Sequence, residues 1–393
     1  MSDKKSILIL FKERKKETPN SFFYERKFSK EYNVNTVFIS DYLEDNSLKI
    51  IKKINNIIKE ERISIALFEG DHLSIFDTKF IKSIDNSVKK GIFLQDDYMF
   101  HYINRITASE CDFVLTACPL SDLKFKELGY NSIFLPVEAD GSIFKDYNEK
   151  KIYDVLFFGR VKNNRSRIVK FLKENAVNIM ECGPYDPISN TPEKLAKLIN
   201  KSKIVLNFSE SDNKNRENNS LSYYRYYYQM KGRVCFIGMC NSLCLSEYSP
   251  SNELIFNNNE IPYFKNKEDC LKIIQKLIKD DLILRKTTEK YREKCLYFED
   301  SNYMKKIKNF FETLNLNKKV NIKIPYWYEY AFFKKNIMLR YRQNKFISFF
   351  SQVFISIFLT NYKTKYLIPI FFSLGIFVSI LFIIKFPLQK LKS

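Results

Sequence analysis

The sequence has 393 residues, of which 45% are hydrophobic and 28% are charged, and its formal net charge is +20. This length allows two domains and an extension, and the charged content excludes a wholly integral membrane protein. The basic residues are interleaved with acidic ones along most of the chain and form no recognised nucleic-acid-binding module. We therefore expect no nucleic-acid partner.

The cysteines and histidines do not form a metal-binding pattern. None of the eight cysteines forms a C-x-x-C pair, and the only histidines are His72 and His101. We interpret the cysteines as small core residues of a reducing compartment. The polar start of the chain and the short apolar run at 7–11 do not resemble an export signal. We therefore expect the main body of the protein to face the cytoplasm.

The first half of the chain alternates short apolar runs with longer segments of helical spacing. Residues 48–61 place apolar side chains three and four positions apart, which predicts a helix. The predicted strands are 7–11, 34–40, 63–68, 91–94, 113–116 and 133–135. This alternation indicates a mostly parallel sheet covered by helices, in a first domain over 1–140.

A polar stretch at 136–151 precedes a second unit of the same kind. Its predicted strands are 153–158, 177–181, 204–208, 234–237 and 243–245, and its predicted helices are 166–175, 192–200 and 267–280. We assign the second domain to 150–317. The predicted fold class is therefore α/β, with two Rossmann-like domains that face each other across a cleft. Ligands of such sheets bind beyond the carboxyl ends of the strands.

The C-terminal part has a different composition. Residues 318–345 combine aromatic residues with many basic ones and a single acid, Glu329, and this composition predicts a basic aromatic linker. We expect its cations, Arg340 among them, to meet anionic lipid headgroups. Residues 346–393 form the predicted membrane-associated segment. Within it, 346–358 is an expected amphipathic helix, and the uncharged run 366–384 is an expected transmembrane helix. A buried soluble helix and a membrane hairpin are the alternatives.

One stretch of the second half carries a specific resemblance. Arg233, Cys240, Glu247 and Tyr248 stand at spacings that resemble the donor-binding segment of the spore-maturation-protein-like glycosyltransferases, a group 1 family with the two-domain GT-B fold. Further segments resemble the same family in the same order along roughly 60–300. They are 112–116, 128–130, 154–160, 203–208 and the acid at Glu260.

The resemblance implies an enzyme that transfers a sugar from a nucleotide-sugar donor to a glycan or lipid-linked acceptor. It implies no cofactor, since the nucleotide sugar is a substrate. A Gly-Arg turn before a helix suits a diphosphate, and a carboxylate suits ribose hydroxyls. The implied donor-binding residues are Gly159, Arg160, Arg165, Asn207, Arg233, Glu247 and Glu260.

One departure from the family affects this donor site. The family's Phe-Glu pair corresponds to Cys235-Phe236, so the carboxylate expected to hold the ribose is absent from its usual position. Either Glu247 or a neighbour replaces it, or the donor site is weakened, or the protein is inactive. The second hypothesis for the chain is therefore a catalytically inactive, membrane-tethered binding or scaffold protein. A sensor similar to periplasmic binding proteins is a third, which the missing export signal disfavours.

The predicted catalytic residues are on the first domain. Asp97 and His101 follow a predicted strand, where a base for the acceptor hydroxyl would be placed, and histidine has a suitable pKa. No Asp-x-Asp motif stands in a convincing position, so we expect no catalytic metal. With cations concentrated before residues 366–384, we expect a single-pass cell-membrane protein whose catalytic domains face the cytoplasm.

Overall fold

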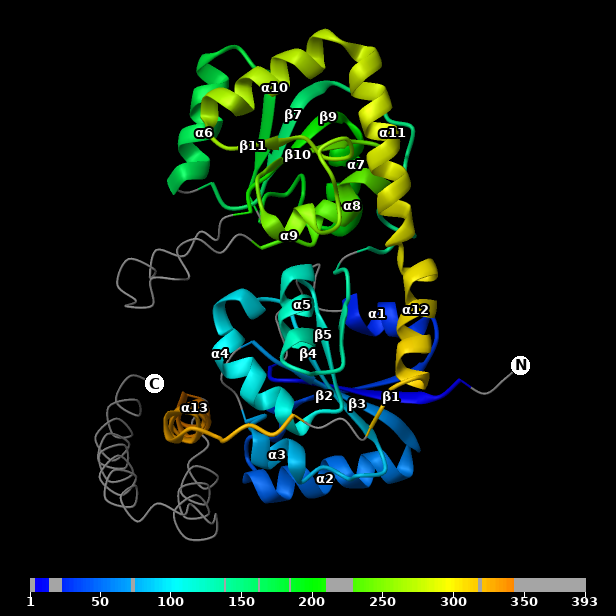
Figure 1. Ribbon diagram of the computed structural model, residues 1–393, viewed down its shortest axis with the longest axis vertical. Coiled ribbons are helices and arrows are strands. Elements are labelled where there is room, and N and C mark those ends of the chain that lie inside the picture. Colours follow the sequence, from blue (N-terminus) through cyan, green and yellow to red (C-terminus); the bar gives the residue numbers. More distant parts are fainter. Residues whose placement is uncertain are drawn as a thin grey trace, which may run out of the picture.

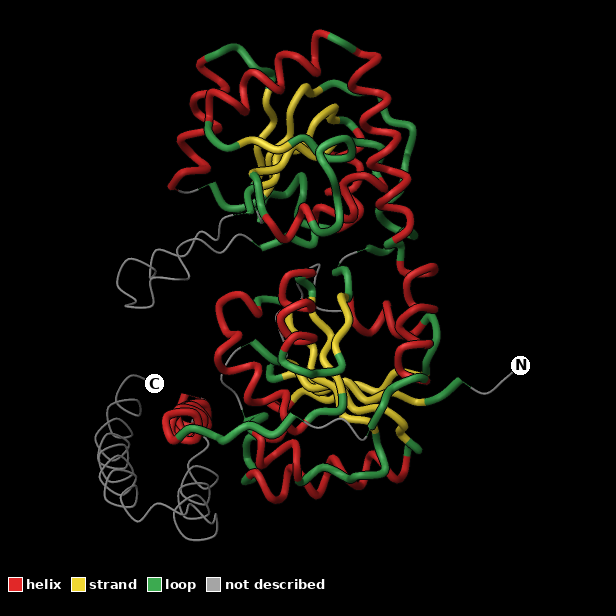
Figure 2. Tube along the Cα trace, viewed as in Figure 1, coloured by secondary structure: helices red, strands yellow, loops and turns green. Residues whose placement is uncertain are grey.

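The structure of the protein is a computed structural model. It describes residues 4–13, 23–71, 75–137, 139–161, 163–183, 185–209, 229–316 and 320–342. Figure 1 shows two α/β units placed one above the other and connected on one side by helices. Figure 2 shows that each unit has strands inside and helices outside. The predicted α/β architecture with two parallel sheets is confirmed.

The first sheet has six parallel strands in the order β2-β1-β3-β4-β5-β6. Its strands are β1 (Ser6–Phe11), β2 (Asn33–Phe38), β3 (Ile63–Glu69), β4 (Lys89–Leu94), β5 (Phe113–Thr116) and β6 (Ser132–Phe134). β1 is apolar and buried from Ile7 to Phe11, as expected of a strand with helices on both faces of its sheet. Because the strands are parallel, their carboxyl ends meet at one edge and their amino ends at the other.

Helices cover both faces of this sheet and complete what we call the first domain. They are α1 (Phe23–Ser29), η1 (Ile39–Tyr42), α2 (Ser47–Glu60), α3 (Thr78–Lys82), α4 (Asp97–Thr107), η2 (Ala108–Glu110) and α5 (Pro119–Glu127). In α2, Ile50, Ile54 and Ile58 share one buried face, and the Asn46 side chain caps the helix by accepting from the backbone N–H of Lys49 at 3.0 Å. α4 begins directly after β4, so its first turn lies at the carboxyl edge.

The second sheet has five parallel strands in the order β11-β10-β9-β7-β8. They are β7 (Tyr153–Phe158), β8 (Ile179–Cys182), β9 (Ser202–Asn207), β10 (Leu243–Glu247) and β11 (Tyr263–Phe264). The helices of this second domain are α6 (Asn163–Glu174), α7 (Pro192–Asn200), α8 (Arg233–Met239), α9 (Pro250–Glu253), α10 (Lys267–Lys279) and α11 (Asp281–Tyr297).

The predicted strand at 234–237 is wrong, because these residues belong to α8. Every residue of α8 after Arg233 is buried, and a short apolar run of this length does not distinguish a buried strand from a buried helix. The helix packs against α11, where the hydroxyl of Tyr291 donates to the backbone carbonyl of Val234. A Cβ on Gly238 would lie 2.5 Å from Cys295 Sγ, so this helix–helix contact needs a glycine.

Helix α12 (Asp300–Glu312) returns the chain from the second domain to the first. Its start is fixed by an ion pair between Lys27 of α1 and Asp300, whose side chains are both 3% exposed. Burial raises the pKa of Asp300, and the Lys27 ammonium opposes that rise. Near its end, Phe311 packs against Phe28 and Phe113, at ring-centroid distances of 6.4 and 4.7 Å. α12 is therefore part of the first domain's core.

The last described helix, α13 (Tyr326–Arg342), is docked on the first domain. Tyr328 and Phe332 form an apolar cluster with Ile103 and Ile106 of α4, and the Tyr328 hydroxyl lies 2.8 Å from the Thr107 hydroxyl. The basic linker predicted for 318–345 is therefore, over its described residues 320–342, a packed segment. The reason is that Tyr328 and Phe332 bury apolar area against α4.

Arg340 corrects the prediction that this residue meets lipid headgroups. Its side chain is fully buried, and its guanidinium donates to the backbone carbonyl of Asp45 at 3.0 Å and to Asn336. The predicted amphipathic helix at 346–358 and the predicted transmembrane helix at 366–384 lie outside the described residues. Across the ranges that are described, no helix combines the length and the apolar character that crossing a bilayer requires.

All eight cysteines are buried and free of disulfide bonds, as expected of small core residues. For Cys235 and Cys244, burial raises the thiol pKa to about 12. A thiol with such a pKa stays protonated at neutral pH and is a poor nucleophile or metal ligand. The cysteines are therefore structural residues.

Candidate active site

A network of buried polar side chains lies at the carboxyl edge of the first sheet. Asp71 follows β3, and Asp97 follows β4 as the first residue of α4. Asn104 lies about two helical turns after Asp97 on α4 and connects the two carboxylates. Its Nδ2 donates to Asp71 Oδ1 at 3.1 Å and to Asp97 Oδ1 at 2.9 Å. The backbone N–H of Asp71 donates in return to Asn104 Oδ1 at 3.1 Å. The amide therefore fixes the two carboxylates relative to each other.

The two predicted catalytic residues are in direct contact. Asp97 Oδ2 lies 2.8 Å from His101 Nδ1, as the i, i+4 spacing on α4 allows, and the Asp97 side chain is 1% exposed. The imidazole is 20% exposed and packs edge-on against Phe125 at 4.9 Å. When Nδ1 donates its proton to this carboxylate, Nε2 keeps a lone pair that can accept a proton. Asp97 and His101 thus form a dyad suited to general-base chemistry.

Asp71 is a site residue that the sequence analysis did not single out. Its backbone has φ of 71°, in the left-handed region that aspartate tolerates better than most residues. Burial raises the pKa of its carboxyl to about 7, and the neighbouring Asp96 charge adds to this, although the backbone N–H of Gln95 donates to the carboxylate. The signal in the sequence was the polar Glu69-Gly70-Asp71 directly after an apolar strand, the same signal that singled out Asp97.

The carboxyl edge of the second sheet brings together two of the predicted donor-binding residues, Gly159 and Arg233. Arg233, at the start of α8, donates from Nη1 to the backbone carbonyl of Phe158 at 2.5 Å, and its guanidinium lies 4.5 Å from the centre of that ring. Gly159 has φ of 129°, and a Cβ there would lie 3.3 Å from Arg233 Nη2. Glycine is thus required both by the backbone conformation and by the close approach of the arginine.

The other two predicted arginines lie beside this turn. Arg160 follows Gly159 and is exposed. Arg165, in the first turns of α6, donates weakly to the Arg160 carbonyl at 3.5 Å and lies 6.0 Å from the Phe208 ring. The β7–α6 connection and the start of α8 therefore concentrate three guanidinium groups at one edge of the sheet, next to the amino end of a twelve-residue helix. This arrangement favours an anion.

Asn207 and Glu247 lie at the neighbouring strand ends. Asn207 ends β9, is fully buried, and donates from Nδ2 to Ser246 Oγ at 2.9 Å, while its Oδ1 has no hydrogen-bond partner among the described residues. Glu247 ends β10 and is 8% exposed, and its backbone carbonyl accepts from Ser209 Oγ at 3.0 Å. These two residues are therefore held by a buried polar network at the same edge as Arg233.

Two further residues of the resemblance have contacts within the protein. Glu260 accepts from the backbone N–H of Asn257 at 2.9 Å in the turn before β11. Phe236, at the position of the family's glutamate, is 1% exposed and stacks on Phe144 at 4.2 Å. The phenylalanine is a core residue, so the carboxylate that the family has there is replaced by packing.

The two carboxyl edges face each other across the interdomain contact. Gln229 of the second domain donates from Nε2 to the Gln95 carbonyl and to Asp96 Oδ1, both at 3.4 Å. Lys231 lies 5.1 Å from the centre of the Tyr98 ring. The acidic edge with the Asp97–His101 dyad is thus directly opposite the basic edge with Arg233. Among the residues the structure describes, no three His, Cys, Asp or Glu side chains are grouped so that they could hold a metal ion.

Comparison with known proteins agrees with this arrangement. Residues 165–312 match the model of a family described as glycosyl transferase-like. No curated protein matches the sequence. Sucrose-phosphate synthase from Thermosynechococcus elongatus superposes with a TM-score of 0.54 at 8% identity, covering 79% of this chain and 100% of that one.

Two further solved structures share the fold. Anabaena HepE in complex with UDP has a TM-score of 0.52 and 9% identity, with coverage of 79% of this chain and 100% of that one. A glycosyltransferase from Rickettsia africae has a TM-score of 0.51 and 11% identity, with coverage of 79% and 98%. At these identities the likeness shows the fold.

Two parallel α/β domains whose carboxyl edges face each other are the architecture of the GT-B fold. The family match lies over the second domain, which carries the basic edge. The chain therefore has the GT-B fold, and its residues 165–312 are similar to the glycosyl transferase-like family, in keeping with the resemblance found in the sequence.

Proposed function

We propose that this enzyme transfers a sugar from a nucleotide-sugar donor, bound at the edge of the second sheet, to a hydroxyl group of a glycan or lipid-linked acceptor, bound over the first domain. The observation that carries the proposal is that the carboxyl edges of the two sheets face each other and differ in chemistry. Arg233 and its neighbours present positive charge, while Asp97 and His101 present a base, and Gln229 and Lys231 join the two sides.

On the donor side, the diphosphate would meet Arg233, Arg160 and Arg165 around the Gly159 turn. The absence of a Cβ at Gly159 lets the Arg233 guanidinium lie against this turn, and guanidinium groups form charge-assisted hydrogen bonds with phosphate oxygens. When the bond between the anomeric carbon and the diphosphate oxygen breaks, that oxygen keeps the electron pair. The arginines stabilise the charge that develops there. Glu247, at the end of β10, is the carboxylate that we propose as the replacement for the missing ribose ligand.

On the acceptor side, His101 Nε2 would take the proton of the attacking hydroxyl as its oxygen forms the new bond to the anomeric carbon. Asp97 holds the ring and stabilises the imidazolium that results. Asn104 and Asp71 keep Asp97 in place. We propose that no divalent cation takes part, since the arginines supply the positive charge that the leaving diphosphate requires.

The first experiment is donor binding and turnover. The structure of HepE contains UDP, so UDP and a panel of UDP-sugars are the first probes. We expect UDP to bind in calorimetry and at least one UDP-sugar to be hydrolysed slowly in the absence of acceptor, with the rate unchanged by EDTA. Absence of binding by any nucleoside diphosphate would refute the donor site, and turnover restored only by manganese would refute metal independence.

A second candidate function rests on Phe236. Because this side chain fills the core where the family has a carboxylate, a protein that binds a nucleotide or glycan without transferring sugar is the alternative. The same experiment separates the two: UDP binding without turnover of any donor would support the binding protein, and measurable hydrolysis would support the transferase.

We further propose that the enzyme acts at the cytoplasmic face of the cell membrane on a membrane-associated acceptor. The support is the uncharged run at 366–384 and the amphipathic pattern at 346–358, together with cations that precede both. Lys334 is exposed on α13 and is available to anionic lipids, whereas Arg340 is buried and cannot contact them. A chain ended after Arg342 should remain in the supernatant when the full chain sediments with vesicles containing anionic lipid. Equal sedimentation of both would refute the anchor.

A further inference from the structure

A pocket lies at the amino edge of the first sheet, opposite the carboxyl edge that carries Asp97 and His101. It has a volume of about 500 Å³, within the range of small-molecule sites. Its walls come from the residues just before β1, from the starts of β3 and β4, from the turn between α1 and β2, and from the last turns of α12. Strands of six residues at about 3.3 Å each separate it from the carboxyl edge by about 20 Å. The pocket is therefore no extension of the active site.

The charges around this pocket are not balanced within it. Four lysines line it against two glutamates, Glu31 and Glu312. Lys308 pairs with Glu31 at 3.2 Å, but Lys89 donates to the neutral carbonyl of Phe311. The backbone carbonyl of Lys5 accepts from Asn33, but its ammonium forms no ion pair or hydrogen bond with any other described residue. The excess of two positive charges would be neutralised by a dianion.

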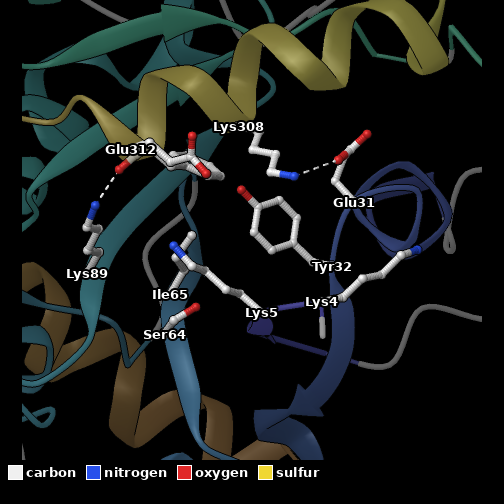
Figure 3. Close-up of a pocket in the computed structure, with 10 residues that line it drawn as sticks. Lys4, Lys5, Glu31, Tyr32, Ser64, Ile65, Lys89, Lys308 and Glu312 are labelled. Atoms are coloured by element: carbon white, nitrogen blue, oxygen red, sulfur yellow. Dashed lines mark hydrogen bonds and ion pairs between the residues drawn. The ribbon is translucent and has the colours of Figure 1, made fainter. Parts of the chain in front are cut away.

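Tyr32 places an unused hydrogen-bonding group in the same space. The residue is only 4% exposed, its ring packs against Phe311, and its hydroxyl has no hydrogen-bond partner in the described parts of the chain. Figure 3 shows the hydroxyl directed into the space between Lys5, Lys308 and Glu312. Burial raises the pKa of Tyr32, so the phenol keeps its proton and can donate it to a ligand. The hydroxyl lines the open space of the pocket, so a bound ligand can reach it.

The remaining walls favour a ligand with hydroxyl groups as well as an anion. Ile65 and Phe311 are buried and provide an apolar wall. Glu312 is an exposed residue at the rim, and both glutamates carry carboxylate oxygens that accept hydrogen bonds from hydroxyl groups. A phosphate group would meet Lys5 and Lys89, while the hydroxyl-bearing part of the same molecule would meet Tyr32 and the glutamates.

We propose that this pocket binds a small phosphate monoester that bears hydroxyl groups, held by Lys5, Lys89 and the Tyr32 hydroxyl, and independent of the donor site. The occupant would contact both α12 and the amino ends of β1, β3 and β4. It would therefore strengthen the attachment of α12, the helix that connects the two domains, to the first sheet.

The test is ligand binding to the full chain with ribose 5-phosphate as the probe, compared with ribose and with inorganic phosphate. We expect ribose 5-phosphate to raise the unfolding temperature saturably, inorganic phosphate to do so more weakly, and ribose to have no effect. The Lys5→Met variant should weaken ribose 5-phosphate binding by about tenfold, since a charge-assisted hydrogen bond is lost. Tyr32→Phe should weaken it by roughly two- to tenfold without lowering the stability of the free protein.

Two further variants make the result decisive. Lys59→Met, an exposed lysine of α2 away from the pocket, is the matched control and should bind as the wild type does. Arg233→Ala, which alters the donor edge, should leave ribose 5-phosphate binding unchanged. The proposal is overturned if no saturable shift is found, if Lys5→Met and Tyr32→Phe bind like the control, or if binding is lost in Arg233→Ala.

Discussion

The carboxyl edges of the two sheets differ in charge and in how their groups are held. At the first edge, Asp71 and Asp97 are buried acids fixed by Asn104, and the dyad partner His101 is partly exposed. At the second edge, Arg233 is fixed on the backbone around Phe158 and Gly159. Two domains of the same α/β architecture thus carry opposite electrostatics where they face each other, which suits proton removal on one side and binding of a diphosphate on the other.

The largest expected effect is on turnover through the first edge. Asp97→Asn keeps the size of the side chain but removes the charge that stabilises an imidazolium at His101, and His101→Gln removes the base. Each should lower kcat by about 10²- to 10⁴-fold while UDP affinity stays unchanged. Steady-state kinetics and calorimetry on the same preparations measure both. Glu127→Gln, an exposed acid at the end of α5, serves as the control. A kcat within twofold of wild type in both variants would remove the dyad from the mechanism.

The second prediction tests whether the two edges act independently, by changing α13, which packs against α4. Phe332 of α13 is 3% exposed and packs against α4, which carries the dyad. Phe332→Ala should reduce the free energy of unfolding by about 3–5 kcal/mol and also lower kcat, with UDP affinity retained. Tyr326→Ala, on the same helix but 44% exposed, should change stability by about 0.5 kcal/mol or less. If UDP affinity fell as much as kcat did, the two edges would not be independent.

A third effect concerns pH and the first domain alone. Asp77 caps α3, and burial raises the pKa of its carboxyl to about 6. The backbone hydrogen bonds to the carboxylate and the charge of Lys79 oppose this rise in pKa, whereas the charge of Glu329 adds to it. Between about pH 4 and 6 the folded protein therefore binds this proton more tightly than the unfolded chain does. The free energy of unfolding should fall by about 3 kcal/mol as pH rises through that window.

Asp77→Asn tests this directly, because asparagine keeps the cap but does not titrate. Denaturant unfolding at several pH values should show that the free energy of unfolding decreases less with rising pH in this variant than in the wild type. The decrease that remains, up to about pH 7, should come from Asp71. Asp41→Asn, an exposed aspartate of the same domain, should keep the full decrease. A slope in Asp77→Asn equal to that of wild type would contradict the assignment.

The smallest effect is on donor affinity through the second edge. Arg233→Ala removes a charge-assisted contact with the diphosphate and should weaken UDP binding by about 1.5–3 kcal/mol, or about tenfold or more. Arg233→Lys should not restore it fully, since lysine lacks the planar fork that lies against the Gly159 turn. Arg160→Ala should weaken binding less, because Arg160 is exposed. Arg167→Ala, exposed on α6, is the matched control, and equal affinities throughout would exclude this edge as the donor site.

Local patterns in the sequence predicted much of the fold but not all of it. The helix predicted at 192–200 coincides with α7 because Pro192 and the Thr191 cap mark its start. The strand predicted at 234–237 is instead α8, because the choice depends on the surface of α11 that packs against it. Similarly, the aromatic residues of α13 suggested a lipid interface, but Tyr328 and Phe332 among them are buried against α4, which no local pattern shows.

The candidate site divides in the same way. By itself the sequence determined two parallel α/β units, the strand ends that carry Asp97 and Gly159, and the spacing that pairs Asp97 with His101, because strand burial and helical geometry act over a few residues. Only the tertiary structure decided that Asn104 joins Asp71 to Asp97, that Arg233 lies on the Gly159 turn, and that Phe236 belongs to the core. These contacts join residues far apart in the chain, and their partners are selected by the packing of whole elements rather than by local sequence.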